Sequence, residues 1–242
     1  METVRAGLLV VLLAVIESSA AWAVEVGAKN KTERSRSEIA VVESYLPKVE
    51  SRLIPRFEFA GVHWPPKKVT LVAFKESRRM ELWAEGGSGQ WRFIRDYRLK
   101  GLSGETGPKL KQGDRQVPEG FYRIEALNPH SRFHLSLKIN YPNDFDRALA
   151  VSERRRNLGG NIFIHGKNVS SGCLAVGDNA VEELFVLSSL IGKEAVSVII
   201  SPKDFRSLDL SSLPEGLPQW SYYLNGLIAQ RLKAFPLSET LN

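Results

Sequence analysis

The sequence contains a single cysteine, Cys173, among its 242 residues. One thiol cannot close a disulfide within the chain, so no cross-link of that kind holds the fold. Histidine is scarce as well, and His63, His130, His134 and His165 have no spacing typical of a zinc site. We therefore expect neither a disulfide nor a bound metal, and the lone thiol needs another explanation.

Long hydrophobic runs are missing beyond the N-terminus, which argues against a later membrane-spanning helix. The N-terminus itself has a short apolar run from Gly7 to Ile16, followed by Ala21-Trp22-Ala23. This pattern predicts a secretory signal peptide over residues 1–23, cleaved after Ala23; an uncleaved membrane anchor is the alternative. We expect an exported protein of the periplasm or cell envelope, with no stable membrane span after cleavage.

Acidic residues are in the minority. The chain has 27 Asp and Glu against 33 Lys and Arg, a formal net charge of +6. The basic residues are spread along the chain and form no dense tract, which together with export argues against nucleic acid as the partner. An anionic cell-wall polymer or a membrane surface fits the charge, and an ordinary solvated basic surface is the alternative.

Repeats and low-complexity tracts are absent, and hydrophobic periodicity predicts an α+β chain that is mostly β in its middle. Helices are predicted at 37–53, 179–190 and 219–235, the first two with N-caps at Ser37 and Asp178. Strands, of which the first three form an antiparallel meander, are predicted at 69–74, 80–84, 90–94, 121–124, 133–139, 161–164 and 195–201. Long polar loops are predicted at 101–120 and 141–160. The resulting divisions are a signal peptide 1–23, a tether and helix 24–65, a main domain 66–206 and a C-terminal helical extension 207–242.

Cys173 lies eight residues after His165, at the end of a loop that contains glycine. Only a thiolate attacks a carbonyl, and an imidazole can take the thiol proton. The loop 166–172 is long enough to reverse direction, which predicts a hydrogen bond between the two side chains. We then expect the thiol to react readily near neutral pH. The alternative is a buried cysteine that acts as a small apolar residue beside a structural histidine.

The turn before Cys173 is a candidate oxyanion site. Gly172 can adopt backbone angles that other residues resist, which allows a sharp turn. The N–H groups of Gly172 and Cys173 are predicted to point at the developing oxyanion. Ser170 is expected to hold the loop or orient the imidazole, and Ser171 and Gly166 complete this loop set.

Several segments together resemble one known family. The His165-Gly166 pair followed by Ser170-Ser171-Gly172-Cys173 resembles the His-Gly…Ser-x-Gly-Cys signature of the YkuD-type L,D-transpeptidase catalytic domain. The resemblance covers roughly residues 69–205 and is greatest for the YafK-like branch of murein L,D-transpeptidases. Further similar segments are Gly107-Pro108-Lys109, Gly113-Asp114, Pro118–Tyr122, Ser131–Leu137 and Tyr141–Arg147.

The resemblance implies a mixed, mostly β fold with a cleft, flanked here by N- and C-terminal helices. It also implies attack on the bond after meso-diaminopimelate in a peptidoglycan stem peptide. Cys173 matches the nucleophile and His165 the general base. Gly172, Ser170 and Gly166 match the remaining motif positions. No metal and no organic cofactor is implied.

One departure concerns substrate binding. Most members carry an arginine two residues after the cysteine, but this chain has Cys173-Leu174-Ala175. Carboxylate binding then falls to another basic residue, with Arg123, Lys138, Arg147 and the 154–156 arginine cluster as candidates. The alternating segment 133–139 predicts a polar face with His134, Ser136 and Lys138, which lines the cleft or is simply solvated. The predicted substrate-binding set is His134, Ser136, Tyr141, Arg123 and Arg147.

Three functions remain open from the sequence. The first is transfer: a thioester on Cys173 is resolved by an amine of another stem peptide, in cell-wall remodelling linked to cell shape. The second is hydrolysis only, which releases a murein-linked peptide or a murein-anchored lipoprotein. The third is a non-catalytic module that binds murein.

Overall fold

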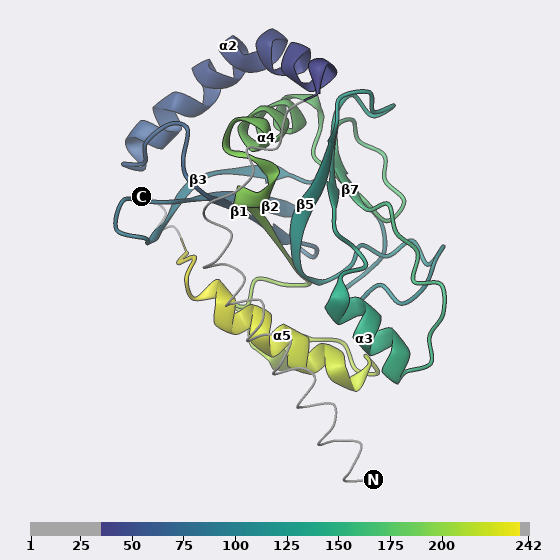
Figure 1. Ribbon diagram of the computed structural model, residues 1–242. Helices are drawn as coiled ribbons and strands as arrows, with labels where there is room; N and C mark the ends of the chain where they lie inside the picture. The colour runs from purple at the N-terminus through teal and green to yellow at the C-terminus, as the bar shows by residue number, and fades with distance from the viewer. Residues whose placement is uncertain (1–34, 238–242) are drawn as a thin grey trace.

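The computed structural model describes residues 35–237 (Figure 1), so the predicted signal peptide lies outside the described residues. Its centre is a nine-stranded mixed sheet with the strand order β3-β2-β1-β9-β5-β6-β7-β8-β4. The strands are β1 (Val69–Phe74), β2 (Arg79–Glu85), β3 (Trp91–Arg98), β4 (Gly101–Leu102), β5 (Gly120–Asn128), β6 (Ser136–Ile139), β7 (Phe163–His165), β8 (Leu174–Ala175) and β9 (Val196–Ser201). The sheet and its flanking helices confirm the predicted α+β class.

Strands β1 and β9 run in parallel near the middle of the sheet and are covered on both faces. All of β1 is buried, and its sequence is rich in residues that favour strands. Side chains alternate between the two faces of a strand. Leu71 and Ala73 accordingly join the core beneath two helices, whereas Val72 and Phe74 join the smaller core on the other face. Burial on both faces explains the continuous apolar run.

Helices form a layer on each side of this sheet (Figure 1). Helices α2 (Arg36–Phe59) and α4 (Asp178–Ile191) cover one face, and α5 (Gln219–Leu232) covers the other. Helix α3 (Asp144–Ser152) follows β6 in the chain, and short 3₁₀ helices span Lys193–Ala195 and Leu210–Ser212. Within residues 35–237, none of the helices combines the length and the apolar character needed to cross a membrane.

Helix α2 begins earlier and ends later than the sequence predicts. Its N-cap is Ser35, whose hydroxyl accepts a hydrogen bond from the Glu38 N–H, and not Ser37. The helix continues through both Pro47 and Pro55. Both prolines are exposed, so each costs one hydrogen bond on the solvent side while the buried stripe of the helix stays intact.

Three further local predictions are wrong. Residues 141–160 are not a continuous loop, because α3 forms there behind a capping box between Asn143 and Asp146. The predicted strand 133–139 begins only at Ser136, because His134 has a φ of 76°, which interrupts the extended backbone. Asp178 is the first residue of α4 and not its cap, which is Gly177.

Helix α2 is bound to α4 and β3 by a buried charge cluster. Arg52 lies 3.1 Å from a carboxylate oxygen of Glu182 and 2.9 Å from one of Glu183. Arg95 of β3 reaches Glu183 at 2.9 Å. Burial opposes ionisation of Glu182, but hydrogen bonds from Arg52 and His134 hold the pKa of this carboxyl below its usual value. Glu182 and Glu183 therefore attach α4 to α2.

We expect Arg52→Met to lower the free energy of unfolding by about 3 kcal/mol, because it leaves two buried carboxylates short of a partner. Urea denaturation at neutral pH measures the change. Arg36→Met, an exposed position on the same helix, is the control and should shift the value by less than about 0.5 kcal/mol. Equal stability of the two variants would show that the cluster does not hold α2 in place.

Candidate active site

Parallel pairing of β7 with β8 brings Cys173 and His165 to one face of the sheet. His165 lies opposite Ala175 in this pairing. The same register puts Cys173 beside Phe163, whose N–H donates to the sulfur at 3.4 Å. Alternate positions share a face, so extending the pairing by one residue places the Cys173 side chain on the face that carries His165.

The imidazole of His165 is held in one tautomer. Its Nδ1 lies 2.7 Å from the carbonyl oxygen of Gly166. A carbonyl only accepts hydrogen bonds, so Nδ1 carries the proton and Nε2 keeps its lone pair. The ring packs on Phe133, with centroids 4.6 Å apart, and Ser136 lies opposite it on β6. Burial lowers the pKa of His165, so the ring is a neutral proton acceptor at neutral pH.

Gly166 is required by close packing. A Cβ built at this position would lie 2.6 Å from a carboxylate oxygen of Asp178 and 2.6 Å from the carbonyl oxygen of Phe133. Asp178 in turn accepts the N–H of Lys167 at 2.8 Å, which ties the loop to the start of α4. The glycine after the histidine therefore lets the loop approach α4 and lets its own carbonyl bind the imidazole.

The Cys173 thiol is half-buried and is not hydrogen-bonded to His165 within the described chain. Its sulfur lies 3.8 Å from the Asn161 carbonyl oxygen and accepts from the Phe163 N–H. Burial raises the pKa of the Cys173 thiol, and the Phe163 N–H and the charge of Lys109 only partly offset this. The expectation of a resting hydrogen bond is therefore corrected, whereas ready reaction near neutral pH stays a prediction. The directions of the two pKa shifts favour a neutral thiol and a neutral imidazole.

The turn before the cysteine is organised by two serine hydroxyls. The Ser170 hydroxyl accepts from the Cys173 N–H at 3.0 Å and donates to the Cys173 carbonyl at 2.6 Å. The Gly172 N–H donates to the Ser103 hydroxyl at 2.6 Å, and Gly172 has a φ of 92°, as a sharp turn requires. Ser170 thus holds the loop, as the sequence predicts. The two N–H groups predicted to face an oxyanion are already bound, which corrects that expectation for this conformation.

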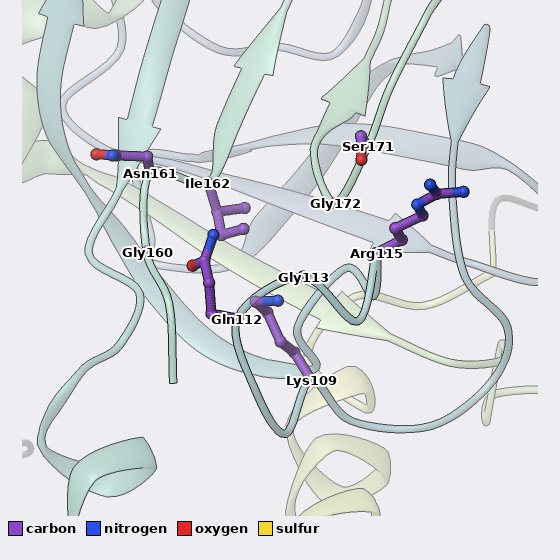
Figure 2. A pocket seen from close by; sticks show the side chains of 9 residues that line it. All are labelled: Lys109, Gln112, Gly113, Arg115, Gly160, Asn161, Ile162, Ser171 and Gly172. Atoms are coloured by element: carbon purple, nitrogen blue, oxygen red, sulfur yellow. The ribbon is translucent and has the colours of Figure 1, made fainter. Parts of the chain in front are cut away.

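Two hollows adjoin the segment next to Cys173, and both include Gly160 and Asn161. The larger, of about 330 Å³, is lined by Arg123, Glu125, Lys138, Asn140, Tyr141, Pro142, Asn143, Asp144, Arg147, Gly160 and Asn161. The smaller, of about 120 Å³, is shown in Figure 2 and is lined by Lys109, Gln112, Gly113, Arg115, Gly160, Asn161, Ile162, Ser171 and Gly172. The carbonyl oxygen of Asn161, a residue that both hollows share, lies 3.8 Å from the sulfur of Cys173.

Three predicted substrate-binding residues, Arg123, Tyr141 and Arg147, line the larger hollow together with Lys138. Lys138 pairs with Glu125 at 3.0 Å, and Arg147 lies 3.7 Å from Asp144. Arg123 takes part in no ion pair with another described residue.

His134 and Ser136 lie elsewhere. The His134 ring binds Glu182 of α4 at 3.0 Å and packs edge-on against Tyr45 of α2, so it faces the helices. Its positive φ is the physical reason, because it takes His134 out of the predicted strand alternation. Ser136 is buried opposite His165 and does not line either hollow.

Two residues near the thiol are not predicted as site residues. Ser103 carries no signal in the local sequence and reaches the turn before Cys173 from beyond β4. Lys109 belongs to a segment noted only for its family resemblance and reaches the smaller hollow from the long loop after β4. The glycine, lysine and proline content of that loop indicates a function only in general terms. Among residues 35–237, no group of three histidine, cysteine or acidic side chains is arranged to hold a metal ion.

Comparisons with known proteins indicate one family. Residues 68–196 match the family described as the L,D-transpeptidase catalytic domain, YkuD. The chain is 34% identical over 178 residues to YafK of Escherichia coli K12, named as a candidate L,D-transpeptidase, and this covers 65% of this chain and 69% of that protein.

Solved structures are more distant. The helical cell shape determining protein Pgp2 of Campylobacter jejuni is 19% identical with a TM-score of 0.44, over 67% of this chain and 56% of that one. Bd1075 of Bdellovibrio bacteriovorus is 18% identical with a TM-score of 0.42, over 73% of this chain and 59% of that one.

Alkylation of Cys173 by iodoacetamide should increase about tenfold per pH unit and should still increase above pH of about 9, because burial keeps the thiol protonated. The same protein unfolded in urea is the control, and its rate should level off near the ordinary cysteine pKa of about 8.5. Mass spectrometry follows the single thiol directly. A plateau below that value in the folded protein would mean that the resting thiol is already ionised.

Proposed function

The chain belongs to the YkuD family of L,D-transpeptidase catalytic domains, and from this premise we propose that it is a cysteine acyl-transfer enzyme of the cell envelope that acts on peptidoglycan stem peptides. Family membership supports the link to peptidoglycan. The observation that carries the catalytic assignment is the hydrogen bond from His165 Nδ1 to the Gly166 carbonyl, which leaves Nε2 as a base on the face shared with Cys173.

The first half-reaction forms a thioester. His165 Nε2 takes the thiol proton, and the sulfur of Cys173 attacks the amide carbonyl on the L-centre of diaminopimelate. The tetrahedral intermediate collapses as the carbon–nitrogen bond breaks. His165 returns the proton to the departing amine, and the terminal D-residue is released. Burial favours the neutral form of both groups, so the proton passes from the thiol to Nε2 as the sulfur attacks.

The second half-reaction resolves the thioester. An amine from a second stem peptide attacks the thioester carbonyl, His165 accepts its proton, and the sulfur departs as the thiolate that is then reprotonated. The product is a new peptide cross-link. Water in place of the amine gives hydrolysis and a free carboxylate. Both hollows share Asn161, whose carbonyl contacts the half-buried sulfur, so the larger can take the acyl donor and the smaller the departing residue.

The larger hollow suits the acyl part of the donor. It is lined by the cations of Arg123, Lys138 and Arg147 and the carboxylates of Glu125 and Asp144. Diaminopimelate carries both an amine and a second carboxylate on its side chain, so a hollow with both signs of charge complements it. Arg123 is the cation that no carboxylate of the described chain neutralises, which makes it the best partner for the substrate carboxylate.

Incubation of the purified protein with peptidoglycan sacculi tests the proposal. We expect release of D-alanine from tetrapeptide stems together with new cross-linked muropeptides, detected by chromatography and mass spectrometry. Cys173→Ala should abolish both products while binding to sacculi persists, and His165→Ala should lower the rate at least about 100-fold. Free peptide without cross-links would show that the enzyme catalyses hydrolysis and not transfer. Binding without any product, even by the unchanged protein, would overturn the enzymatic assignment.

Arg123→Gln should raise KM for the donor about tenfold with little change in kcat, because it removes a charged hydrogen bond made by substrate and transition state alike. Arg92→Gln, an exposed position on β3, changes the net charge equally and should leave KM unchanged. Steady-state release of D-alanine gives both constants. A loss in kcat alone would place Arg123 in the chemical step and outside substrate binding.

A further inference from the structure

The smaller hollow lies directly beside the catalytic turn. Ser171 and Gly172 immediately precede Cys173 in the chain, and they line this hollow together with Asn161, whose carbonyl contacts the sulfur. The opposite wall is the loop between β4 and β5, which supplies Lys109 and Arg115. Two cationic residues therefore belong to the wall of this hollow, although they lie far from Cys173 in sequence.

Lys109 is built into this wall and does not belong to the solvated surface. It is only 8% exposed. Its ammonium donates to the Lys111 carbonyl at 2.9 Å and to the Asp114 carboxylate. Asp114 is itself fixed by the N–H groups of Leu110, Lys111 and Gln116. The position of the ammonium is therefore set by the folded loop.

One hydrogen-bond donor of Lys109 remains available. A lysine ammonium has three N–H groups, and two acceptors within the described chain account for two of them. In Figure 2 the Lys109 side chain extends toward the middle of the labelled residues, whereas Arg115 and Asn161 point outward on opposite sides. The third N–H is thus free for a ligand within the hollow.

The backbone donors nearest the thiol are already used. The N–H groups of Gly172 and Cys173 bind Ser103 and Ser170. Position 175 is alanine, fully buried on β8, and a Cβ on Gly101 of the paired strand β4 would lie 3.2 Å from its Cβ, so a longer side chain at 175 would press on β4. Of the two cations that line the hollow, Lys109 is the one whose side chain extends toward its middle (Figure 2).

We propose that the smaller hollow is a carboxylate subsite, in which Lys109 binds the free α-carboxylate of the D-residue that leaves when Cys173 attacks. This assignment rests on the function proposed above. Its volume of about 120 Å³ holds a few water molecules or one small residue, but no second stem peptide. The acyl donor fills the larger hollow across Asn161, so the departing residue lies on the Lys109 side. Only a chain-terminal residue carries an α-carboxylate, so the subsite selects stem ends.

Two small alkylating reagents test the subsite without any turnover. Iodoacetate carries a carboxylate next to its reactive carbon and iodoacetamide carries a neutral amide. In both, the thiolate of Cys173 displaces iodide, so the ratio of the two rates cancels any change in the fraction of thiolate. We expect Lys109→Met to lower the iodoacetate-to-iodoacetamide ratio about tenfold or more, the usual effect of losing a hydrogen bond to a charged group.

Lys111→Met is the matched control, because its side chain is exposed, the net charge changes equally, and its backbone groups stay in place. Its ratio should equal that of the unchanged protein. If the ratio in Lys109→Met equals that of the unchanged protein, the proposed subsite is overturned. If the ratio falls equally in both variants, the effect is general charge attraction, and the proposed subsite is overturned as well. Because alkylation needs only the thiol, these outcomes stand even if sacculi yield no product.

A second measurement needs no variant and covers the case in which Lys109→Met fails to fold. D-Alanine should slow the reaction of the unchanged protein with iodoacetate, and D-alaninamide at the same concentration should not. Protection by both compounds, or by neither, would overturn a subsite that recognises the carboxylate.

Discussion

The site depends first on the parallel register of β7 and β8. This short pair has only two matched positions, Ile164 with Leu174 and His165 with Ala175, yet it decides which way Cys173 faces. A slip of one residue would turn the sulfur to the opposite face of the sheet and away from the imidazole. The register is held from both sides: Gly166 packs against Asp178 where no side chain fits, and the Ser170 hydroxyl closes the turn onto both backbone groups of Cys173. The catalytic geometry is therefore a consequence of loop closure and not of strand length.

A second constraint fixes the loop that faces this turn. Lys75, at the end of β1, is almost fully buried and donates to the carbonyls of Gly107 and Val117 and to the carboxylate of Glu119. All three ammonium protons are thus satisfied, and they hold both ends of the segment that carries Lys109. Burial lowers the pKa of Lys75, which is tolerated because the pair with Glu119 and two carbonyls replaces water. The positive charge near the thiol is anchored in the central strand of the core, so core packing and site electrostatics are coupled.

The local parts of this design can be predicted from the sequence. Continuous runs of strand-forming apolar residues identify β1 and β9, and apolar alternation identifies β2 and β3. An N-cap signal and helical spacing identify α4 and α5. The relation of His165 to Cys173 is likewise local, since one loop joins them. The predictions that fail concern features set by single backbone angles or by contacts between residues far apart in the sequence. His134 leaves the strand through one positive φ, and α3 depends on a reciprocal cap between Asn143 and Asp146 within a polar stretch. Ser103 and Lys109 reach the turn only after β4 has paired with β8, an arrangement that no spacing in the sequence records.

Residue 175 connects the packing of the edge strand with the position of the basic residue near the thiol. Strand β4 lies at the edge of the sheet beside β8, and a Cβ on Gly101 would lie 3.2 Å from the Cβ of its partner Ala175. A long basic residue two positions after Cys173 would therefore press on that edge strand. The strand in turn leads into Ser103 and the loop of Lys109, so the element that excludes a cation from β8 delivers one from the other side of the turn. The basic residue that is missing after Cys173 is thus compatible with this fold only when it comes from the loop. The edge strand β4 and the cation at position 109 are therefore expected to change together. A chain without β4 would have room for a basic residue at 175 and would not need one at 109.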